Sequence, residues 1–258
     1  MAQRGWAIVT GASSGIGREF ARALAKEGHP VLAVARRRER LDELAAEVAR
    51  AGGRVEPMAL DLEAAGAADA IAERARSLGE VELLVNNAGF GDCGPFTSFP
   101  VERAQRMIRL NATAAVELTH RILPALVARR GGGVINVCST GAFQPVPNFA
   151  VYAATKAFLL HFTEALAYEL RKSGVRLLAL CPGPVATEFM PHDAPLMKRA
   201  PNVTTPEEVV RVALRAFRRR RVVKIVGFLN ALAAFLQRFA PRALVRRVAG
   251  LFFALPEK

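Results

Sequence analysis

The chain has 258 residues, of which 52% are hydrophobic, and its 36 Lys and Arg against 23 Asp and Glu give a net charge of +13. This length and composition exclude a small disulfide-stapled module and a chain that is disordered throughout. The three cysteines (Cys93, Cys138 and Cys181) lie in no CxxC pattern, and the four histidines have no ligand spacing. We therefore expect no metal site and a reducing, cytoplasmic setting. Because only Met1–Gly5 precede the first apolar run, we also expect no signal peptide.

The first apolar run, 6–10, leads into a glycine-rich turn and then into a helical pattern. The turn reads TGASSGIG, with glycines at positions 11, 15 and 17, and apolar residues recur at helical spacing from Ile16 until Gly28. A strand, a glycine turn and a helix in this order offer free backbone N–H groups and the positive end of the helix dipole to a phosphate. We predict a nucleotide-binding turn, with the spacing GxxxGxG in place of GxGxxG.

The second buried strand, 30–35, ends without the acidic residue that often holds the adenosine ribose in NAD-binding units. Ala35 takes that place, and Arg36, Arg37 and Arg38 follow it. Guanidinium groups bind phosphate, and no carboxylate is present there to repel one. Arg36 and Arg37 therefore favour NADP(H) over NAD(H). The alternative is that these arginines are the solvated start of the next helix.

Further strands are predicted at 54–60, 82–86, 134–138, 175–181 and 222–226, with helical segments between them. The alternation, at about thirty residues per unit, predicts an α/β fold with a doubly wound parallel sheet. Ligands of such sheets bind at the carboxyl ends of the strands. The segment 101–130 is expected to form two helices with Asn111 near their junction, where an asparagine can equally be a satisfied core residue.

Ser139 follows the strand 134–138, and Tyr152 and Lys156 open the helical segment 152–172. Residues four apart share one face of a helix, so the lysine ammonium can stabilise a phenolate and lower the phenol pKa from about 10. A phenol tuned in this way, beside a hydroxyl, suits proton transfer at a carbonyl or alcohol. Taken alone, a YxxxK pair is more commonly a surface pair, so its catalytic interpretation depends on the rest of the chain.

The ordered motifs resemble the short-chain dehydrogenase/reductase family over roughly residues 4–226. They are TGASSGIG at 10–17, NNAG at 86–89, Asn111, Ser139, Tyr152 with Lys156, and Pro182-Gly183 with Thr187. Each motif is modest alone, but the order and spacing of the set are specific. The resemblance implies a single Rossmann-type domain, 1–226, with a seven-stranded parallel sheet of order 3-2-1-4-5-6-7.

The resemblance also implies roles for four catalytic residues. Tyr152 is the general acid and base, and Lys156 lowers its pKa and binds the nicotinamide ribose. Ser139 orients and polarises the substrate carbonyl, and Asn111 holds a water that links Lys156 to a proton relay. Hydride passes from the cofactor to a carbonyl carbon while Tyr152 protonates the oxygen.

The residues expected to bind the cofactor lie at the strand ends. They are Gly11, Ser13, Ser14, Gly15, Ile16 and Gly17 at the pyrophosphate and ribose, Arg36 and Arg37 at the 2′-phosphate, Asp61 and Leu62 at the adenine, Asn86 under the adenosine with Ala88 and Gly89 of the same motif, and Pro182, Gly183, Val185 and Thr187 at the nicotinamide, together with Tyr152 and Lys156.

The substrate loop is expected at about 184–205, where Phe189, Met190, Leu196 and Met197 indicate an apolar ligand. Beyond it, residues 227–258 form an apolar and basic helical extension, and residues 201–258 hold 12 Lys and Arg against 3 Asp and Glu. Neither apolar run of the extension reaches the roughly twenty residues that span a bilayer. Two alternatives stay open: the extension packs on the body, over the substrate site or in an oligomer contact, or it lies in a membrane interface.

The sequence thus predicts an NADPH-dependent carbonyl reductase for a hydrophobic ketone, such as a 3-oxoacyl, steroid-like or other lipid-like substrate. The alternatives are an NAD(P)+-dependent alcohol dehydrogenase of the same fold and a non-catalytic NADPH-sensing or scaffold protein. The resemblance implies a homodimer or homotetramer built on the helices around 101–130 and 152–172. No motif indicates a nucleic-acid partner.

Overall fold

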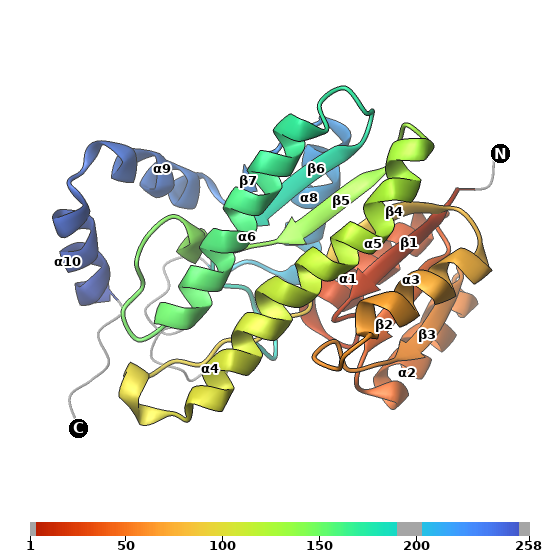
Figure 1. Ribbon diagram of the computed structural model, residues 1–258, viewed down its shortest axis with the longest axis horizontal. Helices are drawn as coiled ribbons and strands as arrows, with labels where there is room; N and C mark the ends of the chain where they lie inside the picture. Colours follow the sequence, from red (N-terminus) through yellow and green to blue (C-terminus); the bar gives the residue numbers. More distant parts are fainter. Residues whose placement is uncertain (1–3, 190–202, 253–258) are drawn as a thin grey trace.

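A seven-stranded parallel sheet forms the centre of the protein (Figure 1). The computed structural model describes residues 4–189 and 203–252. Within them the strands are β1 (Trp6–Thr10), β2 (Val31–Ala35), β3 (Val55–Ala59), β4 (Val81–Asn86), β5 (Gly133–Val137), β6 (Arg176–Cys181) and β7 (Val223–Ile225). Their order across the sheet is β3-β2-β1-β4-β5-β6-β7, which confirms the predicted order. The central strands read as continuous apolar runs because helices cover both faces of the sheet.

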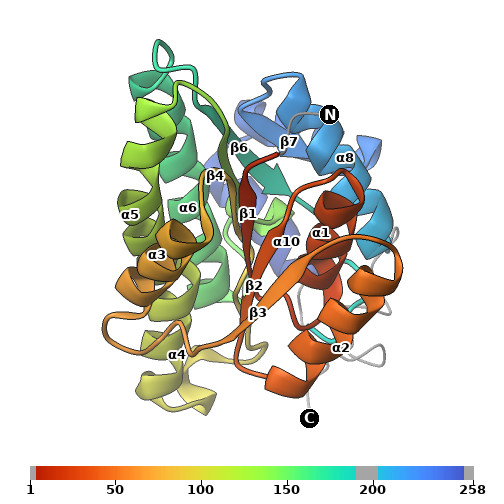
Figure 2. The same ribbon diagram turned by 90° about the vertical axis from the view of Figure 1, so that its right-hand side faces the viewer.

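Two layers of helices enclose the sheet (Figure 2). One face carries α1 (Gly15–Lys26), α2 (Arg38–Arg50) and α8 (Pro206–Arg218), and the other carries α3 (Ala67–Leu78), α4 (Val101–Ile108), α5 (Ala114–Ala128) and α6 (Ala150–Glu169). Each layer buries its own apolar cluster against the strands: Phe20, Leu41 and Leu44 on the first face, Ile71 and Leu118 on the second. Burying apolar side chains on both faces is the main force that holds such a sandwich together.

The carboxyl ends of β1 and β4 meet where the strand order reverses. β1 is followed by β2 and β3 on one side, and β4 pairs with β1 on the other. The two ends are tied together by Asn87, whose Nδ2 donates to the Thr10 carbonyl oxygen at 2.9 Å, while its backbone N–H donates to Thr10 Oγ1 at 3.0 Å. Open α/β sheets bind ligands in the crevice at such a reversal.

The segment 101–128 is two helices, as predicted, and they join through a π-helical turn at Arg109–Thr113 that contains Asn111. Single π turns within helices are frequent at functional sites. The helix predicted at 152–172 begins earlier, at Ala150, and ends at Glu169. The expected substrate loop is described only at its two ends; Met190, Leu196 and Met197 lie outside the described residues.

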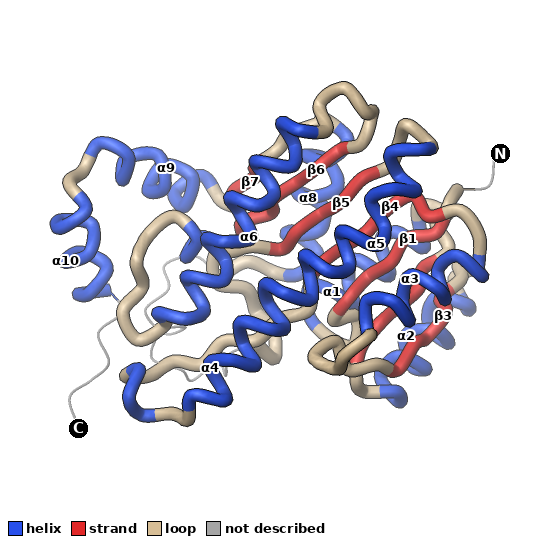
Figure 3. The backbone as a smooth tube through the Cα atoms, in the orientation of Figure 1, coloured by secondary structure: helices blue, strands red, loops and turns tan. Residues whose placement is uncertain are grey.

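The C-terminal extension forms α9 (Phe228–Leu236), a short 3-10 turn at Gln237–Phe239 and α10 (Arg242–Phe252) (Figure 3). These elements lie beyond the edge strand β7, at the opposite end of the molecule from α2 and α3 (Figure 1). Among the described residues, no helix combines the length and apolarity that crossing a bilayer requires.

Candidate active site

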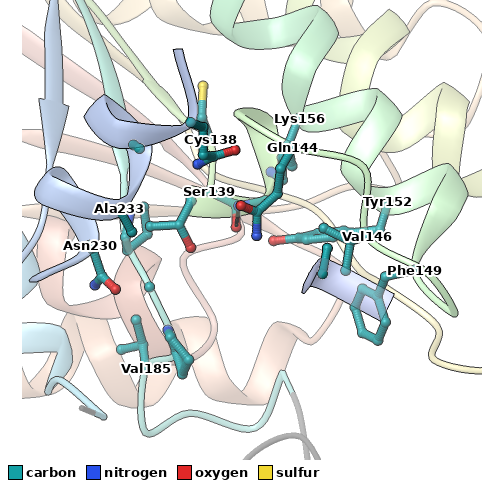
Figure 4. Close-up of a pocket in the computed structure, with 18 of the residues that line it drawn as sticks. Cys138, Ser139, Gln144, Val146, Phe149, Tyr152, Lys156, Val185, Asn230 and Ala233 are labelled. Carbon is teal, nitrogen blue, oxygen red and sulfur yellow. Dashed lines mark hydrogen bonds between the residues drawn. The ribbon is translucent and has the colours of Figure 1, made fainter. Parts of the chain in front are cut away.

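Ser139, Tyr152 and Lys156 meet at the carboxyl end of β5. β5 delivers Ser139, and the first two turns of α6 carry Tyr152 and Lys156 on one face (Figure 4). Ser139 Oγ accepts the Gly141 N–H at 3.1 Å, so the Ser139 hydroxyl proton remains available to a further acceptor. Lys156 is buried, and its Nζ donates to the Val137 carbonyl oxygen at 2.8 Å.

The Tyr152 ring is held between two aromatic side chains. Its centroid lies 5.4 Å from that of Phe149, in an edge-to-face arrangement, and 5.5 Å from that of Phe189. Such contacts fix the direction of the phenol, because aromatic pairs prefer a narrow range of geometries. The hydroxyl consequently faces the same space as Ser139 and Gln144 (Figure 4).

Burial raises the pKa of Tyr152 to about 12, although a hydrogen bond with Ser139 acts in the opposite direction. We expected Lys156 to lower this pKa, but its Nζ lies 5.8 Å from the centroid of the Tyr152 ring and is bonded to the Val137 carbonyl. Burial also lowers the pKa of Lys156. The structure therefore presents Tyr152 as a neutral phenol, which suits a proton donor.

Asn111 is buried and its side chain is fully engaged. Its Oδ1 accepts the Phe90 N–H at 3.0 Å, and its Nδ2 donates to the Phe90 carbonyl at 2.9 Å and to Thr155 Oγ1 at 3.2 Å. These bonds tie the segment after β4 to α6. They agree with the interpretation of Asn111 as a satisfied core residue, and its place in a water relay stays a prediction.

The glycine turn between β1 and α1 is closely packed against the end of β4. A Cβ on Gly17 would lie 2.3 Å from the Gly11 carbonyl oxygen, and one on Gly11 would lie 2.9 Å from Ala88 Cα. Gly11 and Gly15 also have φ values of 67° and 53°, which favour glycine. The backbone can therefore approach a ligand closely here.

The N-terminus of α1 fits the pyrophosphate of a dinucleotide. Ser14 is its N-cap residue, and no side chain caps the first turn. Uncapped N–H groups at the positive end of a helix dipole bind phosphate. The side chains of Ser13 and Ser14 face Arg37, and Ile16 lines the adjoining pocket. NAD(P) thus fits this turn, with Gly11, Ser13, Ser14, Gly15, Ile16 and Gly17 as the residues that would hold it.

The two arginines after β2 have different surroundings. Arg37 donates to Ser13 Oγ at 3.0 Å, to Ser14 Oγ at 2.9 Å and to Glu188 at 2.9 Å. Arg36 lies 4.0 Å from Glu63, and 62% of its side chain is exposed. The structure therefore brings Arg37 to the glycine turn and leaves Arg36 at its rim.

Two of the residues predicted to contact the adenine or the adenosine are buried inside the protein. Leu62 is buried in the core with α3, and Asn86 is buried with its Nδ2 donating to Asn136 Oδ1 at 2.9 Å and to Thr119 Oγ1 at 3.0 Å. Asp61 is exposed, and its Oδ1 accepts the Glu63 N–H at 3.0 Å. Asn86 thus supports the strand ends from within the sheet layers.

The residues predicted at the nicotinamide lie together after β6. Pro182, Gly183, Val185 and Thr187 line one pocket with Gly89, Ser139 and Tyr152. The Pro182 carbonyl accepts the Thr140 N–H at 2.9 Å, which joins this segment to the residues after Ser139. A Cβ on Gly15 would lie 3.0 Å from Thr187 Cγ2, so the segment also reaches the glycine turn.

The pocket has a volume of about 590 Å³, and its walls are mostly apolar side chains. Pro184 and Phe189 of the expected substrate loop line it. Beyond the predicted residues, it is lined by Asn87, Val137, Cys138, Thr140, Gly141, Gln144, Val146 and Phe149, and from the extension by Asn230, Ala233, Ala234, Leu236, Gln237, Ala240, Leu244, Val245, Val248 and Ala249. The sequence reasoning missed Asn87, Gln144 and the individual extension residues. Asn87 was visible as the second asparagine of the NNAG motif, whereas the extension residues had only a general apolar pattern as a signal.

The inner face of the extension packs on the body. Ala234 and Ala249 are buried, and Asn230 Nδ2 lies 2.6 Å from the position that a Cβ would take on Gly183. Gly250 approaches Pro147 in the same way, at 4.0 Å. The inner face of the extension therefore lies against the body beside the pocket, and both alternatives for the role of the extension stay predictions.

The comparisons with known proteins point to one family. The family model described as short chain dehydrogenase matches residues 5–195. A short chain dehydrogenase of Pseudocercospora fijiensis is 40% identical over 192 residues, or 73% of this chain and 62% of that relative, so the chain spans less than two thirds of the relative's length.

Two solved structures match over almost the whole chain. A short-chain dehydrogenase from Sphingobium yanoikuyae in complex with NADPH has a TM-score of 0.82 at 33% identity and covers 92% of this chain and 95% of that one. The bulky-bulky ketone specific alcohol dehydrogenase from Comamonas testosteroni has a TM-score of 0.81 at 28% identity and covers 99% and 96%. Given these matches, the strand order and the Ser139, Tyr152 and Lys156 constellation, the chain belongs to the short-chain dehydrogenase/reductase family of NAD(P)-dependent oxidoreductases.

Proposed function

We propose that the chain is an NADPH-dependent carbonyl reductase that acts on a bulky hydrophobic ketone. The observation that carries this proposal is the position of Ser139, Tyr152 and Lys156 at one end of a mostly apolar pocket of about 590 Å³. The nicotinamide end of the cofactor is predicted to occupy part of this pocket, and the ketone would take the rest. The few polar groups of such a pocket fix how its ligand is oriented. NADPH, when bound, supplies the hydride.

The protein's own groups handle the substrate oxygen. Tyr152 Oη donates its proton to the carbonyl oxygen, and Ser139 Oγ donates a hydrogen bond to the same oxygen. The Gly141 N–H occupies an acceptor site of Ser139 Oγ, which favours this donor role. Lys156 Nζ lies 5.8 Å from the centroid of the Tyr152 ring, where its ammonium group would hold the nicotinamide ribose and favour any negative charge that develops on Oη.

The preference for NADPH rests on Arg37. Its guanidinium already binds two hydroxyl oxygens and a carboxylate at the edge of the glycine turn, a donor arrangement that suits a phosphate. The similarity to a dehydrogenase solved with NADPH supports the same preference. Arg36 is proposed to contribute to the positive potential at this rim.

The proposed substrate class rests on the walls of the pocket. Val146, Phe149 and Phe189 from the body and Leu236 and Leu244 from the extension give them their apolar character. The similarity to an alcohol dehydrogenase specific for bulky-bulky ketones supports a large ketone, since that match extends over 99% of this chain. Steroid-like, 3-oxoacyl and other lipid-like ketones fit this description.

Oxidation of NADPH, followed at 340 nm with a panel of small and bulky ketones, tests the proposal. The wild-type chain should turn over bulky apolar ketones, and Tyr152→Phe should lower kcat at least about 100-fold while NADPH affinity stays within about twofold. Turnover only in the alcohol-oxidising direction would favour the alcohol dehydrogenase alternative. Tight NADPH binding without turnover of any carbonyl or alcohol would favour a sensor.

We also propose that the chain forms a homodimer or homotetramer through α5 and α6. Phe158 and Tyr168 of α6 are 49% and 70% exposed, which is unusual for aromatic side chains on a rigid helix face. Light scattering of the purified chain measures its mass directly; a monomer at all concentrations would remove the oligomer proposal.

A cytoplasmic location is also proposed. The three cysteines are free, in agreement with such a location.

A further inference from the structure

The outward side of the C-terminal extension is an exposed apolar surface, here called the outer face. Its residues are Phe228, Leu229, Leu232, Phe235, Leu236 and Phe239 from α9 and the turn after it, and Leu244, Val248 and Leu251 from α10. Their exposed fractions run from 40% for Leu232 to 80% for Phe228. Residues spaced in this way on a helix form one continuous stripe. Large exposed apolar surfaces mark interaction sites in folded proteins.

The charged residues of α9, the turn after it and α10 are all arginines. Arg238, Arg242, Arg246 and Arg247 are all exposed, and between Glu208 and Glu257 the sequence contains no Asp or Glu. An exposed apolar stripe flanked by arginines complements a surface that has an apolar interior and an anionic outer layer. The interface of a bilayer with anionic phospholipids has this character.

The same charges argue against a second copy of the chain on this face. In a two-fold symmetric dimer each patch faces its own copy, so four arginines would meet four arginines, and the sequence between Glu208 and Glu257 has no carboxylate to pair with them. Juxtaposed like charges disfavour such an interface.

The outer face continues into the active-site pocket. Leu236, Leu244 and Val248 are 55%, 52% and 44% exposed, and all three also line the pocket that contains Ser139 and Tyr152. An apolar path therefore leads from the exposed side of α9 and α10 to the proposed reacting groups. Figure 1 shows these two helices at one end of the molecule, where a flat surface can reach them.

We propose that the outer face docks on the surface of a bilayer that contains anionic phospholipids, with the pocket mouth opening toward the lipid. The apolar stripe enters the interface, and the arginines bind the lipid phosphates. The inner face stays packed on the body through Ala234 and Ala249, so docking needs no unfolding of the extension. Delivery of an apolar ketone from the bilayer into the pocket rests on the reductase function proposed above, whereas docking itself does not.

Vesicle flotation of the full-length chain tests the docking. At about 0.05 M salt, the protein should float with vesicles that contain about 30% phosphatidylserine, and binding should fall at least about tenfold with pure phosphatidylcholine vesicles. Phe228→Gln with Phe239→Gln removes two exposed rings that do not line the pocket. This double variant should lose at least about tenfold in vesicle binding while it reduces a water-soluble ketone as wild type does.

Matched variants separate the outer face from general surface effects. Phe96 is 60% exposed in the turn Phe96–Ser98, outside the extension, so Phe96→Gln should bind vesicles as wild type does. Arg238→Gln with Arg242→Gln should weaken binding, whereas Arg50→Gln with Arg76→Gln removes the same charge from α2 and α3 and should weaken it less.

Three outcomes would overturn the proposal. In the first, the wild-type chain does not float with anionic vesicles. In the second, the extension variants float as well as the wild type does. In the third, the wild type does not float and the Phe228 and Phe239 double variant has a different mass in light scattering, which would assign the outer face to a second copy. Flotation requires no turnover, so the flotation result can be interpreted even if the chain reduces no ketone. The ketone assay can likewise be interpreted if the chain does not bind vesicles.

Discussion

Tyr152 is the proposed proton donor, and its surroundings determine its protonation state. Burial between Phe149, Phe189 and α6 disfavours the phenolate and raises the pKa of Tyr152 to about 12. The phenol is therefore protonated throughout the neutral range. A protonated donor is the form needed to reduce a carbonyl, whereas oxidation of an alcohol needs the phenolate.

The pH dependence of the two directions should therefore differ. Ketone reduction at saturating NADPH should be independent of Tyr152 ionisation from about pH 6 to pH 9, because the donor form stays fully populated below its pKa. Alcohol oxidation should rise by up to about tenfold per pH unit over the same range, since the phenolate fraction rises with pH. Steady-state rates in both directions check this. A reduction rate that falls with a midpoint near pH 7 would contradict the raised pKa.

Arg37 and Arg36 were given equal weight by the sequence, but the structure distinguishes them. Arg37→Ala should weaken NADPH binding by about tenfold to 100-fold, because charged hydrogen bonds contribute about 1.5–3 kcal/mol, and NADH binding by much less. Arg36→Ala should have a smaller effect, since Arg36 is more exposed and lies toward Glu63. Fluorescence titration of each variant with both cofactors measures this. Equal losses for NADPH and NADH in Arg37→Ala would exclude a 2′-phosphate contact.

At the scale of elements, Glu188 connects the start of α2 to the segment after β6. It accepts from Arg37 at 2.9 Å and from Arg40 at 3.1 Å, and the bond from Arg37 holds the pKa of Glu188 below its ordinary value. The ionised carboxylate thus occupies the guanidinium group of Arg37, which is proposed to bind the 2′-phosphate.

Glu188→Gln should tighten NADPH binding by about twofold to fivefold, the range expected when an exposed competing charge is removed. NADH binding should hardly change, because NADH has no phosphate to compete with Glu188. The same cofactor titrations measure both affinities, and Arg38→Gln is a control that removes an exposed arginine paired with its helix neighbour Asp42. Weaker NADPH binding by Glu188→Gln would show that the carboxylate orients Arg37 and does not compete for it.

Elements that are marked by short, local sequence patterns could be predicted most accurately. The strands could be placed within one residue at each end, because most of them are apolar runs bounded by turn residues. Ser139, Tyr152 and Lys156 were found through short, ordered motifs. Asn86 could not be distinguished from Asn87 without the structure, since only the register at the end of β4 sends the first amide into the core and the second toward Thr10.

For the C-terminal extension, the sequence pattern did not identify which side chains line the pocket. Its apolar pattern was clear, but which residues face inward depends on the position of α9 after the turn at Gly227, whose φ is 87°. The apolar periodicity of the sequence does not determine that position. The side chains of Ala234 and Leu236 therefore became visible as pocket walls only in three dimensions.

Enlarging the inner face of α9 should change substrate choice. Ala234 is buried and lines the pocket, so Ala234→Leu should raise KM for a bulky ketone at least about tenfold and leave a small ketone within about threefold, because added methylenes occupy the substrate volume. Ala231→Leu is the matched control, since Ala231 lies on the same helix and does not line the pocket. Equal effects of the two substitutions, or equal effects on both ketones, would remove α9 from the substrate site.

For the whole molecule, the predicted cofactor site, here called the groove, would join parts of the chain that are far apart in sequence. The glycine turn, the start of α2, the end of β4 and the segment after β6 all contribute predicted cofactor contacts, and Arg37, Asn87 and Thr187 already link them pairwise. A ligand that binds only the folded state stabilises it by mass action. Because these contacts cross the sheet from β2 to β6, occupancy of the groove should stabilise the domain as a unit.

NADPH should therefore raise the melting temperature of the full chain. At about 100 times its Kd, a ligand adds about 2.7 kcal/mol to the free energy of unfolding, which corresponds to about 5–10 °C for a domain of this size. NADH at the same concentration should raise Tm less, and Arg37→Ala should reduce the NADPH shift to that of NADH. Differential scanning fluorimetry with both cofactors measures these shifts without any substrate. Equal shifts for NADPH and NADH in the wild type would mean that the arginines after β2 are only the solvated start of α2, since no cofactor phosphate would then be using them.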